Sequence, residues 1–285
     1  MTLNIAHRGA RSLAPENTLA AARKAFEVGA DFWEVDVAVT ADEALILFHD
    51  DSLTRTTDAK KRFPDRAPWT FTTFTSSEIN LLDAGSWFLE ADPFARITAG
   101  EVTAEEQASF RGERIPTLQE ALLFTQANNW RINVELKRLP PPMDRFPVVD
   151  RVLSLIEDLA IDPRQFVLSS FNHEWLRQVR RHNPNISLQA LIGFSQIEPQ
   201  DWGSLEFGTY NARVTLTDED QVHNLKEKGI GVNLYIVNDR EDMLRFIAAG
   251  AAGLITDFPQ TLAGLLKKRE LYSTPSNLEA SNGRK

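Results

Sequence analysis

The chain of 285 residues contains no cysteine, and it also lacks long apolar runs and an excess of basic residues. Without cysteine it cannot form disulfides, iron–sulfur clusters or zinc sites with thiolate ligands. No stretch approaches the roughly 20 apolar residues of a membrane-spanning helix, so we expect no stable insertion into a membrane. The net charge of −9 excludes a broad electrostatic surface for nucleic acid. A small anionic substrate would therefore need a local positive site, from side chains or a metal.

The two ends of the sequence carry expectations of their own. Residues 1–7 (Met-Thr-Leu-Asn-Ile-Ala-His) lead directly into a strand pattern, without the basic region and apolar segment of a secretory signal. We therefore expect a cytoplasmic protein. Residues 271–285 are mostly polar and small, which is typical of a disordered tail. Residues 1–270 are predicted to form a single domain.

Short apolar, β-rich runs alternate with helical patterns, which indicates parallel strands joined by helices. The first strand is expected at residues 3–7, and the next helix has Leu19, Ala22 and Phe26 on one face. A second strand, residues 31–39, is separated by only four residues from an extended run at residues 44–49. Because a parallel crossover needs a dozen or more residues, this return is predicted to be a hairpin. The hairpin would return His49 to the end of the second strand where Glu34 and Asp36 lie.

From about residue 51 to residue 113 the sequence shows no alternation of strand and helix patterns. Because a structureless loop of this length is uncommon in a compact domain, we predict an inserted subdomain with some helices. The alternation then resumes with a helix at residues 117–127 and a strand at residues 131–137. Further strands are predicted near residues 165–170, 187–192, 209–214, 231–237 and 253–256, and further helices near 147–159, 174–181, 197–205, 218–228, 240–249 and 261–268. Without the hairpin return there are eight strands, the number that closes an α/β fold of the TIM (β/α)8 type.

Three carboxylates are predicted to face the barrel interior. Glu34 and Asp36 are two apart on a strand and share one face, whereas the apolar residues beside them face the helices. Two inward carboxylates repel each other at a heavy desolvation cost unless a cation joins them. Salt bridges to barrel arginines or lysines are the structural alternative. Glu135 adds a third carboxylate, and such an all-oxygen site suits Mg²⁺ or Ca²⁺.

Basic and imidazole side chains stand near the ends of the same strands, where TIM barrels gather their catalytic groups. His7 and Arg8 end the first strand, although each alone could be a packed or solvated residue. Lys137 lies two residues beyond Glu135, where its ammonium would meet a phosphate oxygen or neutralise a carboxylate. His49 ends the hairpin return, and Asp50 would either orient this histidine or cap the following turn.

Taken in order, these segments resemble the glycerophosphodiester phosphodiesterase family. The matching stretches are residues 6–9 (Ala-His-Arg-Gly), 15–18 (Pro-Glu-Asn-Thr), 34–36, 49–57, 114–118, 134–137, 169–171 and 253–259. They follow the family's order and extend over residues 3 to 268. Each stretch alone is a weak signal, but the ordered set is highly specific. The resemblance implies a TIM barrel with a small insertion after the second strand, and one divalent cation held by Glu34, Asp36 and Glu135.

The resemblance also implies an activity, the hydrolysis of small glycerophosphodiesters to sn-glycerol 3-phosphate and an alcohol. His7 and His49 would form the catalytic pair, because histidine titrates nearest neutral pH and can both take and give a proton. Arg8 and Lys137 would bind the phosphate with the metal. The family usually has a tryptophan where this chain has Tyr235, which puts the shape and polarity of the substrate pocket in doubt.

Two other functions remain compatible with the sequence. A lysophospholipase D or another lipid phosphodiesterase on the same barrel would need a membrane-docking surface, which the aromatic residues at positions 69–88 could supply. Packing of those aromatics inside the insertion is the alternative. A non-catalytic phosphate-binding barrel would be favoured if a key position were replaced, and none is.

Overall fold

The structure is a computed structural model of the chain and describes residues 1–195 and 200–273. Within these residues nine strands form one sheet in the order β1-β9-β8-β7-β6-β5-β4-β2-β3, and β1 also pairs with β2. Eight strands therefore close into a parallel barrel, as predicted, and β3 is the extra antiparallel strand. The strands are β1 (Leu3–Ala6), β2 (Phe32–Val39), β3 (Leu45–Leu47), β4 (Ile132–Leu136), β5 (Phe166–Ser170), β6 (Ser187–Leu191), β7 (Thr209–Arg213), β8 (Gly231–Tyr235) and β9 (Gly253–Thr256).

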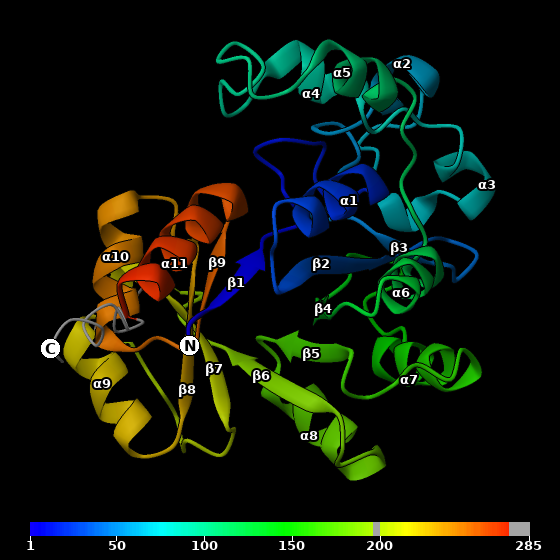
Figure 1. The fold of residues 1–285 in the computed structure, drawn as a ribbon. Coiled ribbons are helices and arrows are strands. Elements are labelled where there is room, and N and C mark those ends of the chain that lie inside the picture. Colours follow the sequence, from blue (N-terminus) through cyan, green and yellow to red (C-terminus); the bar gives the residue numbers. More distant parts are fainter. Residues whose placement is uncertain (196–199, 274–285) are drawn as a thin grey trace, which may run out of the picture.

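Helices surround the barrel on its outer side (Figure 1). They are α1 (Leu19–Glu27), α6 (Leu118–Ala127), α7 (Val148–Asp158), α8 (His173–His182), α9 (Glu219–Glu227), α10 (Arg240–Ala249) and α11 (Pro259–Ser273). All seven were predicted, with bounds that differ by a few residues. The predicted tail lies outside the described residues, apart from residues 271–273 at the end of α11.

The helix predicted near residues 197–205 is wrong for the part of it that the structure describes. Residues 200–205 form a turn between β6 and β7. Gly203 and Leu205 have φ values of +61° and +54°, which a right-handed helix does not allow. The Asp201 side chain accepts a hydrogen bond from the Gly203 backbone, which stabilises the turn instead. The remaining positions, 197–199, lie outside the described residues.

Small residues bring α1 close to the end of β1. Thr18 caps the helix by accepting a hydrogen bond from Ala21 N, and the fully buried face is made of alanines. Of the three apolar residues predicted to share a face, only Ala22 is fully buried, and Phe26 is 43% exposed. Gly9 has φ +81°, and a Cβ atom there would lie 2.7 Å from Ala21. The turn that carries the end of β1 thus requires glycine at this position.

The hairpin after β2 forms as predicted. β3 pairs antiparallel with β2, with Val37 opposite Leu47. The alternation along β2 is also confirmed, because the indole of Trp33 is fully buried on the helix side and donates to Thr125 of α6. Glu34 and Asp36 therefore face the opposite side, toward the barrel interior.

The stretch after β3 forms the predicted inserted subdomain, which contains α2 (Ala59–Arg62), the 3-10 helix η1 (Phe71–Thr73), α3 (Ser76–Ile79), α4 (Ser86–Ala91) and α5 (Ala104–Phe110). In Figure 1 it lies beyond α1, on the side toward which the β1 arrow points. An ion pair between Lys24 of α1 and Glu106 of α5 links the two parts. Phe71, Phe74 and Phe88 are almost completely buried and belong to the same apolar cluster as Val37 of β2 and Leu47 of β3, so the insertion packs into the main core.

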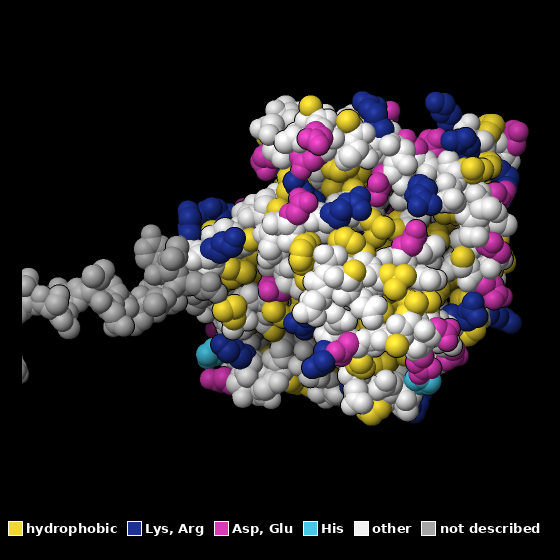
Figure 2. Space-filling model, turned by 45° about the vertical axis from the view of Figure 1, so that its right-hand side comes forward, with side chains coloured by type: hydrophobic (Ala, Val, Ile, Leu, Met, Phe, Trp, Pro, Cys, Tyr) yellow, Lys and Arg dark blue, Asp and Glu magenta, His cyan; other side chains and the backbone are white. Residues whose placement is uncertain are grey.

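The surface mixes charges of both signs. Figure 2 shows lysine and arginine side chains interspersed with aspartate and glutamate around small hydrophobic areas. Among the described helices, none has both the length and the apolar character needed to cross a membrane.

Candidate active site

A cavity of about 1080 Å³ opens where the carboxyl ends of the barrel strands meet. Seven of the eight predicted site residues line this cavity. They are His7, Arg8, Glu34, His49, Glu135, Lys137 and Tyr235. The eighth, Asp36, is 2% exposed and forms ion pairs with two of the seven.

The three carboxylates meet because of strand register. Asp36 of β2 pairs with Glu135 of β4, and Glu34 lies two residues earlier on the same face of β2. One carboxylate oxygen from each of the three lies within 4.8 Å of the others. This spacing and the oxygen-only donor set fit a single divalent cation.

The pKa shifts of the three carboxylates are also those expected for a site that binds a cation. Burial raises the pKa of Glu34 well above its usual value, and the charges of Asp36 and Glu135 raise it further. Burial and the charge of Asp36 raise the pKa of Glu135 to about 7. Burial opposes ionisation of Asp36 as well, but Lys137 and Arg8 hold its pKa below the usual range. Lys137 and Arg8 thus keep Asp36 ionised, and a bound divalent cation would favour the ionised form of the two glutamates in the same way.

His7 lies directly after β1, and its Nδ1 is 2.7 Å from Oδ1 of Asp257, which follows β9. A carboxylate can only accept, so Nδ1 carries the proton and Nε2 faces Glu34, with Oε2 at 4.0 Å. Burial and the charge of Arg8 lower the pKa of His7 to about 4, although the bond to Asp257 opposes that shift. The imidazole is thus neutral at pH 7.

His49 is held in the same manner on the other side of the carboxylates. Its Nδ1 lies 2.6 Å from Oδ1 of Asp50, so Asp50 orients the ring, which was one of the two predicted alternatives. The backbone carbonyl of His49 accepts a hydrogen bond from Lys137 Nζ at 2.9 Å. His49 is more exposed than His7, with 35% of its side chain accessible against 12%.

The two basic residues expected to bind phosphate are also held by carboxylates. Arg8 Nε lies 3.1 Å from Asp36, and Arg8 Nη1 lies 2.8 Å from Glu16. Lys137 Nζ lies 3.4 Å from Asp36 and lines the cavity. The salt-bridge alternative therefore holds for Asp36, whereas no arginine or lysine forms an ion pair with Glu34 or Glu135 within residues 1–195 and 200–268.

Tyr235 contributes its ring to the cavity wall. Its hydroxyl donates to the carbonyl of Ile192 at 2.6 Å, and its ring lies edge-on to Phe171 at 6.2 Å between centroids. The Arg213 guanidinium lies 5.3 Å from the Tyr235 ring centroid. The hydroxyl that put the polarity of the pocket in doubt is thus satisfied within the chain.

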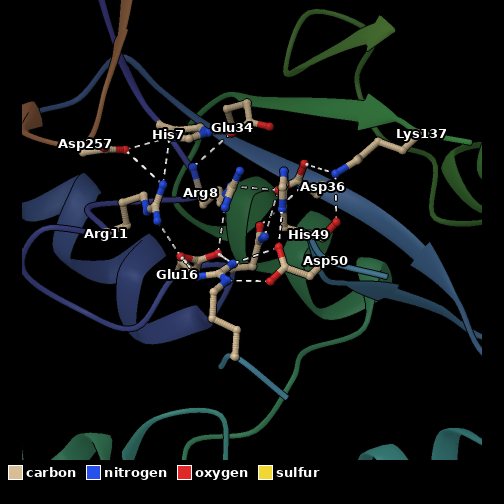
Figure 3. A network of polar contacts seen from close by, with 12 residues as sticks. His7, Arg8, Arg11, Glu16, Glu34, Asp36, His49, Asp50, Lys137 and Asp257 are labelled. Carbon is tan, nitrogen blue, oxygen red and sulfur yellow. Dashed lines mark hydrogen bonds and ion pairs between the residues drawn. The ribbon is translucent and has the colours of Figure 1, made fainter. Parts of the chain in front are cut away.

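Four residues of the site were missed as functional candidates, namely Arg11, Glu16, Arg55 and Asp257. Figure 3 shows Glu16 beneath Arg8, with Arg11 to one side and His49 and Asp50 to the other. Asp257 could have been found from barrel closure, because Ala6 of β1 pairs with Thr256 of β9 and the next residues are His7 and Asp257. For Glu16 and Arg55 the only signal was that each lies in a stretch that matches the family. Arg11 lies next to such a stretch.

Comparison with known proteins agrees with this geometry. Residues 7–261 match the glycerophosphoryl diester phosphodiesterase family. The glycerophosphodiester phosphodiesterase of Caldanaerobacter subterraneus subsp. tengcongensis is 33% identical over 272 residues, which cover 94% of this chain and 98% of that protein.

Solved structures show the same fold. A phosphodiesterase of Oleispira antarctica in complex with the product sn-glycerol-3-phosphate superposes with a TM-score of 0.72 and 25% identity, covering 92% of this chain and 96% of that one. A glycerophosphoryl diester phosphodiesterase structure from Silicibacter pomeroyi has a TM-score of 0.77 and 24% identity, covering 95% and 94% of the two chains. The chain is therefore a phosphoric diester hydrolase that belongs to the glycerophosphoryl diester phosphodiesterase family.

Proposed function

We propose that the enzyme hydrolyses small glycerophosphodiesters, such as glycerophosphocholine or glycerophosphoethanolamine, to sn-glycerol 3-phosphate and an alcohol. The observation that carries the proposal is the cluster of three carboxylates between two oriented imidazoles at one cavity. The Oleispira antarctica relative, whose structure contains sn-glycerol-3-phosphate, supports the choice of product.

Glu34, Asp36 and Glu135 would hold one divalent cation, Mg²⁺ or Ca²⁺. When bound, such a cation stabilises negative charge on phosphoryl oxygens. Arg8 and Lys137 add fixed positive charge beside it, and electrostatic stabilisation of this kind is usually the largest single contribution to catalysis. Lys137 is anchored by the carbonyl of His49, so its ammonium stays at the cavity wall.

His7 and His49 would move the protons of the reaction. Each presents its Nε2 edge to the cavity side because Nδ1 is taken by a carboxylate. One imidazole accepts the proton of the attacking group, and the other protonates the alkoxide of the leaving alcohol. With water as the attacking group this step gives sn-glycerol 3-phosphate directly. With the substrate's own glycerol hydroxyl it gives a cyclic phosphate, which water then opens while the two imidazoles exchange roles. Such pairs work because a carboxylate on Nδ1 fixes both the tautomer and the ring orientation.

The lipid phosphodiesterase alternative loses its expected docking surface. Phe71, Phe74 and Phe88 are buried, and Trp69 and Trp87 pack against the same core. The aromatics of the insertion therefore contribute to the main apolar core, which supports a small, soluble diester as the substrate.

The proposal is tested by measuring two products, sn-glycerol 3-phosphate released from glycerophosphocholine and glycerophosphoethanolamine in a coupled assay, and choline released from glycerophosphocholine and lysophosphatidylcholine. The enzyme is first treated with chelator, and Mg²⁺, Ca²⁺ or Mn²⁺ is then added back. We expect activity with the small diesters, its loss with chelator and its recovery with one or more cations. Activity unaffected by chelator would contradict the metal site, and faster turnover of the lysolipid would contradict the substrate class.

Glu135→Gln tests the ligand set in the same assay. It should raise the cation concentration needed for half-maximal activity, because one of three ligand carboxylates becomes a neutral amide. Glu90→Gln in α4, an exposed glutamate, is the control and should leave that concentration unchanged. An unchanged cation requirement in Glu135→Gln would remove Glu135 from the ligands.

A further inference from the structure

Each of the two histidines ends a chain of contacts that begins away from the cavity. We call the first set the His7 arm, which consists of His7, Asp257, Arg11 and Phe94. We call the second set the His49 arm, which consists of His49, Asp50, Arg55 and Trp87. In both arms a carboxylate binds the imidazole Nδ1, and an arginine binds the carboxylate.

The arginines differ in how closely they bind their carboxylates. Arg55 donates two hydrogen bonds to Asp50, from Nε at 2.5 Å and from Nη2 at 3.1 Å. Arg11 Nη1 lies 3.5 Å from Oδ1 of Asp257. Neither arginine reaches the cavity itself. Arg55 therefore acts on His49 through Asp50, whereas Arg11 acts on His7 through Asp257 and also lies 3.5 Å from His7 Nδ1 through its Nη1.

Both arginines converge on one buried carboxylate. Glu16 Oε2 accepts from Arg11 Nη2 at 2.7 Å, and Glu16 also accepts from Arg55 Nη2 at 2.7 Å and Nη1 at 3.0 Å. A third arginine, Arg8, donates to Glu16 Oε1 at 2.8 Å. The Glu16 side chain is 3% exposed and does not line the cavity. Figure 3 shows this junction between the two histidines.

The insertion covers each arginine with an aromatic ring. The Arg11 guanidinium carbon lies 5.4 Å from the centroid of the Phe94 ring, and that of Arg55 lies 6.0 Å from the Trp87 ring. These distances are within the range of cation–π attraction. The insertion thus supplies Phe94 to the His7 arm, and Arg55 and Trp87 to the His49 arm.

We propose that Glu16 is a positioning residue which, with Phe94 and Trp87 of the insertion, fixes Arg11 and Arg55 and through them the orientation of both catalytic histidines. The inference rests on the proposed histidine pair. It assigns the insertion a part in the reaction that does not require contact with substrate. An arginine suits this role because its planar guanidinium presents five donors in a fixed geometry that binds carboxylates bidentately, whereas a lysine ammonium is a point charge on a flexible stem.

Glu16→Gln is the main test, measured as kcat and KM at saturating metal together with the melting temperature. We expect kcat to fall roughly ten- to hundred-fold, the effect typical of residues that orient functional groups, with a smaller change in KM. Arg55→Lys serves as a second variant at a site that is 41% exposed, where folding is not at risk. It should lower kcat by about ten-fold, and an unchanged kcat would overturn the proposal.

Double variants that combine Glu16→Gln with the loss of one arm distinguish a positioning role of Glu16 from a general contribution to the stability of the fold. In an Asp257→Asn or Asp50→Asn background one arm is already broken, so Glu16→Gln should cost less there than in the wild type. Full additivity in both backgrounds would overturn the proposal. Failure of the underlying histidine pair would appear differently, as activity retained by His7→Ala or His49→Ala.

Two matched tryptophans test the part of the insertion. Trp87 and Trp69 are both half-buried, and the indole nitrogen of each donates to a backbone carbonyl. A cation lies over each ring, Arg55 on Trp87 but Lys60, outside both arms, on Trp69. Trp87→Leu should lower kcat roughly two- to five-fold, the size of a cation–π contact, whereas Trp69→Leu should not. Equal effects of the two substitutions would overturn this part of the proposal.

Discussion

The His7 arm and the His49 arm repeat one chain of contacts in two different surroundings. From imidazole to arginine, the side chains of the first arm are 8–18% exposed, and those of the second are 27–41% exposed. The His7 arm joins the ends of the paired barrel strands β1 and β9, whereas the His49 arm follows β3, the antiparallel strand outside the closed barrel. Water can replace a lost contact in the exposed arm more readily than in the buried one. Equivalent substitutions in the two arms should therefore lower activity more in the buried His7 arm than in the exposed His49 arm.

The largest effects should not depend on exposure at all. His7→Ala and His49→Ala should each lower kcat by on the order of 10²–10⁴-fold, because each removes a proton-transfer group. Turnover at saturating metal measures the loss, and circular dichroism checks the fold. His173→Ala is the control, since this histidine lines the same cavity but contacts the carbonyl of Leu191. Near-normal turnover in either of the first two variants would rule out the paired mechanism.

The two aspartates should separate the arms. Asp257→Asn and Asp50→Asn each place an amide where the imidazole Nδ1–H needs an acceptor, which favours the wrong tautomer. We expect kcat to fall by about 10²-fold for the buried Asp257 and about ten-fold for Asp50, where water can rearrange. The two values of kcat, compared at equal metal saturation, check the difference. Equal losses would show that solvent access does not distinguish the arms.

A smaller effect concerns stability in acid. Burial would raise the pKa of Asp257, but the hydrogen bond and charge of His7 and the charge of Arg11 lower it to about 2. Because the folded pKa lies below the unfolded value, ionised Asp257 stabilises the fold above about pH 4 by about 2 kcal/mol, and this contribution is lost as the pH falls toward 2.

Denaturant unfolding of the wild type and Asp257→Asn between pH 7 and pH 2 measures this contribution. The variant should be less stable at pH 7, and the two curves should approach each other below pH 4. Asp50→Asn should show a smaller pH-dependent difference, because solvent screens the half-exposed Asp50 more strongly. Parallel curves for Asp257→Asn would contradict the assigned ion pair.

Local rules were sufficient to place the carboxylates of the site and His49. Strand alternation placed Glu34 and Asp36 on one side, and the short turn after β2 required a hairpin that returns His49 to them. These inferences depend only on neighbouring residues. Asp257 needed one more step, the closure of the barrel, which pairs the first strand with the last.

Other features depend on side-chain packing that periodicity does not encode. The sequence offers no sign that Arg11 and Arg55, 44 positions apart, share Glu16. The shared face of Leu19, Ala22 and Phe26 did not indicate that the fully buried positions of α1 are alanines, which the close approach of the β1 turn requires. The supposed helix near residue 200 failed because a left-handed backbone at Gly203 and Leu205 overrides an apolar pattern.

The pairing of β1 with β9 has a consequence for the order of events during synthesis. A ribosome that has translated residues 1–135 has already produced His7, His49 and the three clustered carboxylates. Asp257, the acceptor for His7, follows more than a hundred codons later, together with the strand that closes the barrel. The His7 arm therefore cannot form until the strand that closes the barrel has been synthesised, although His7, His49 and the three carboxylates are made long before.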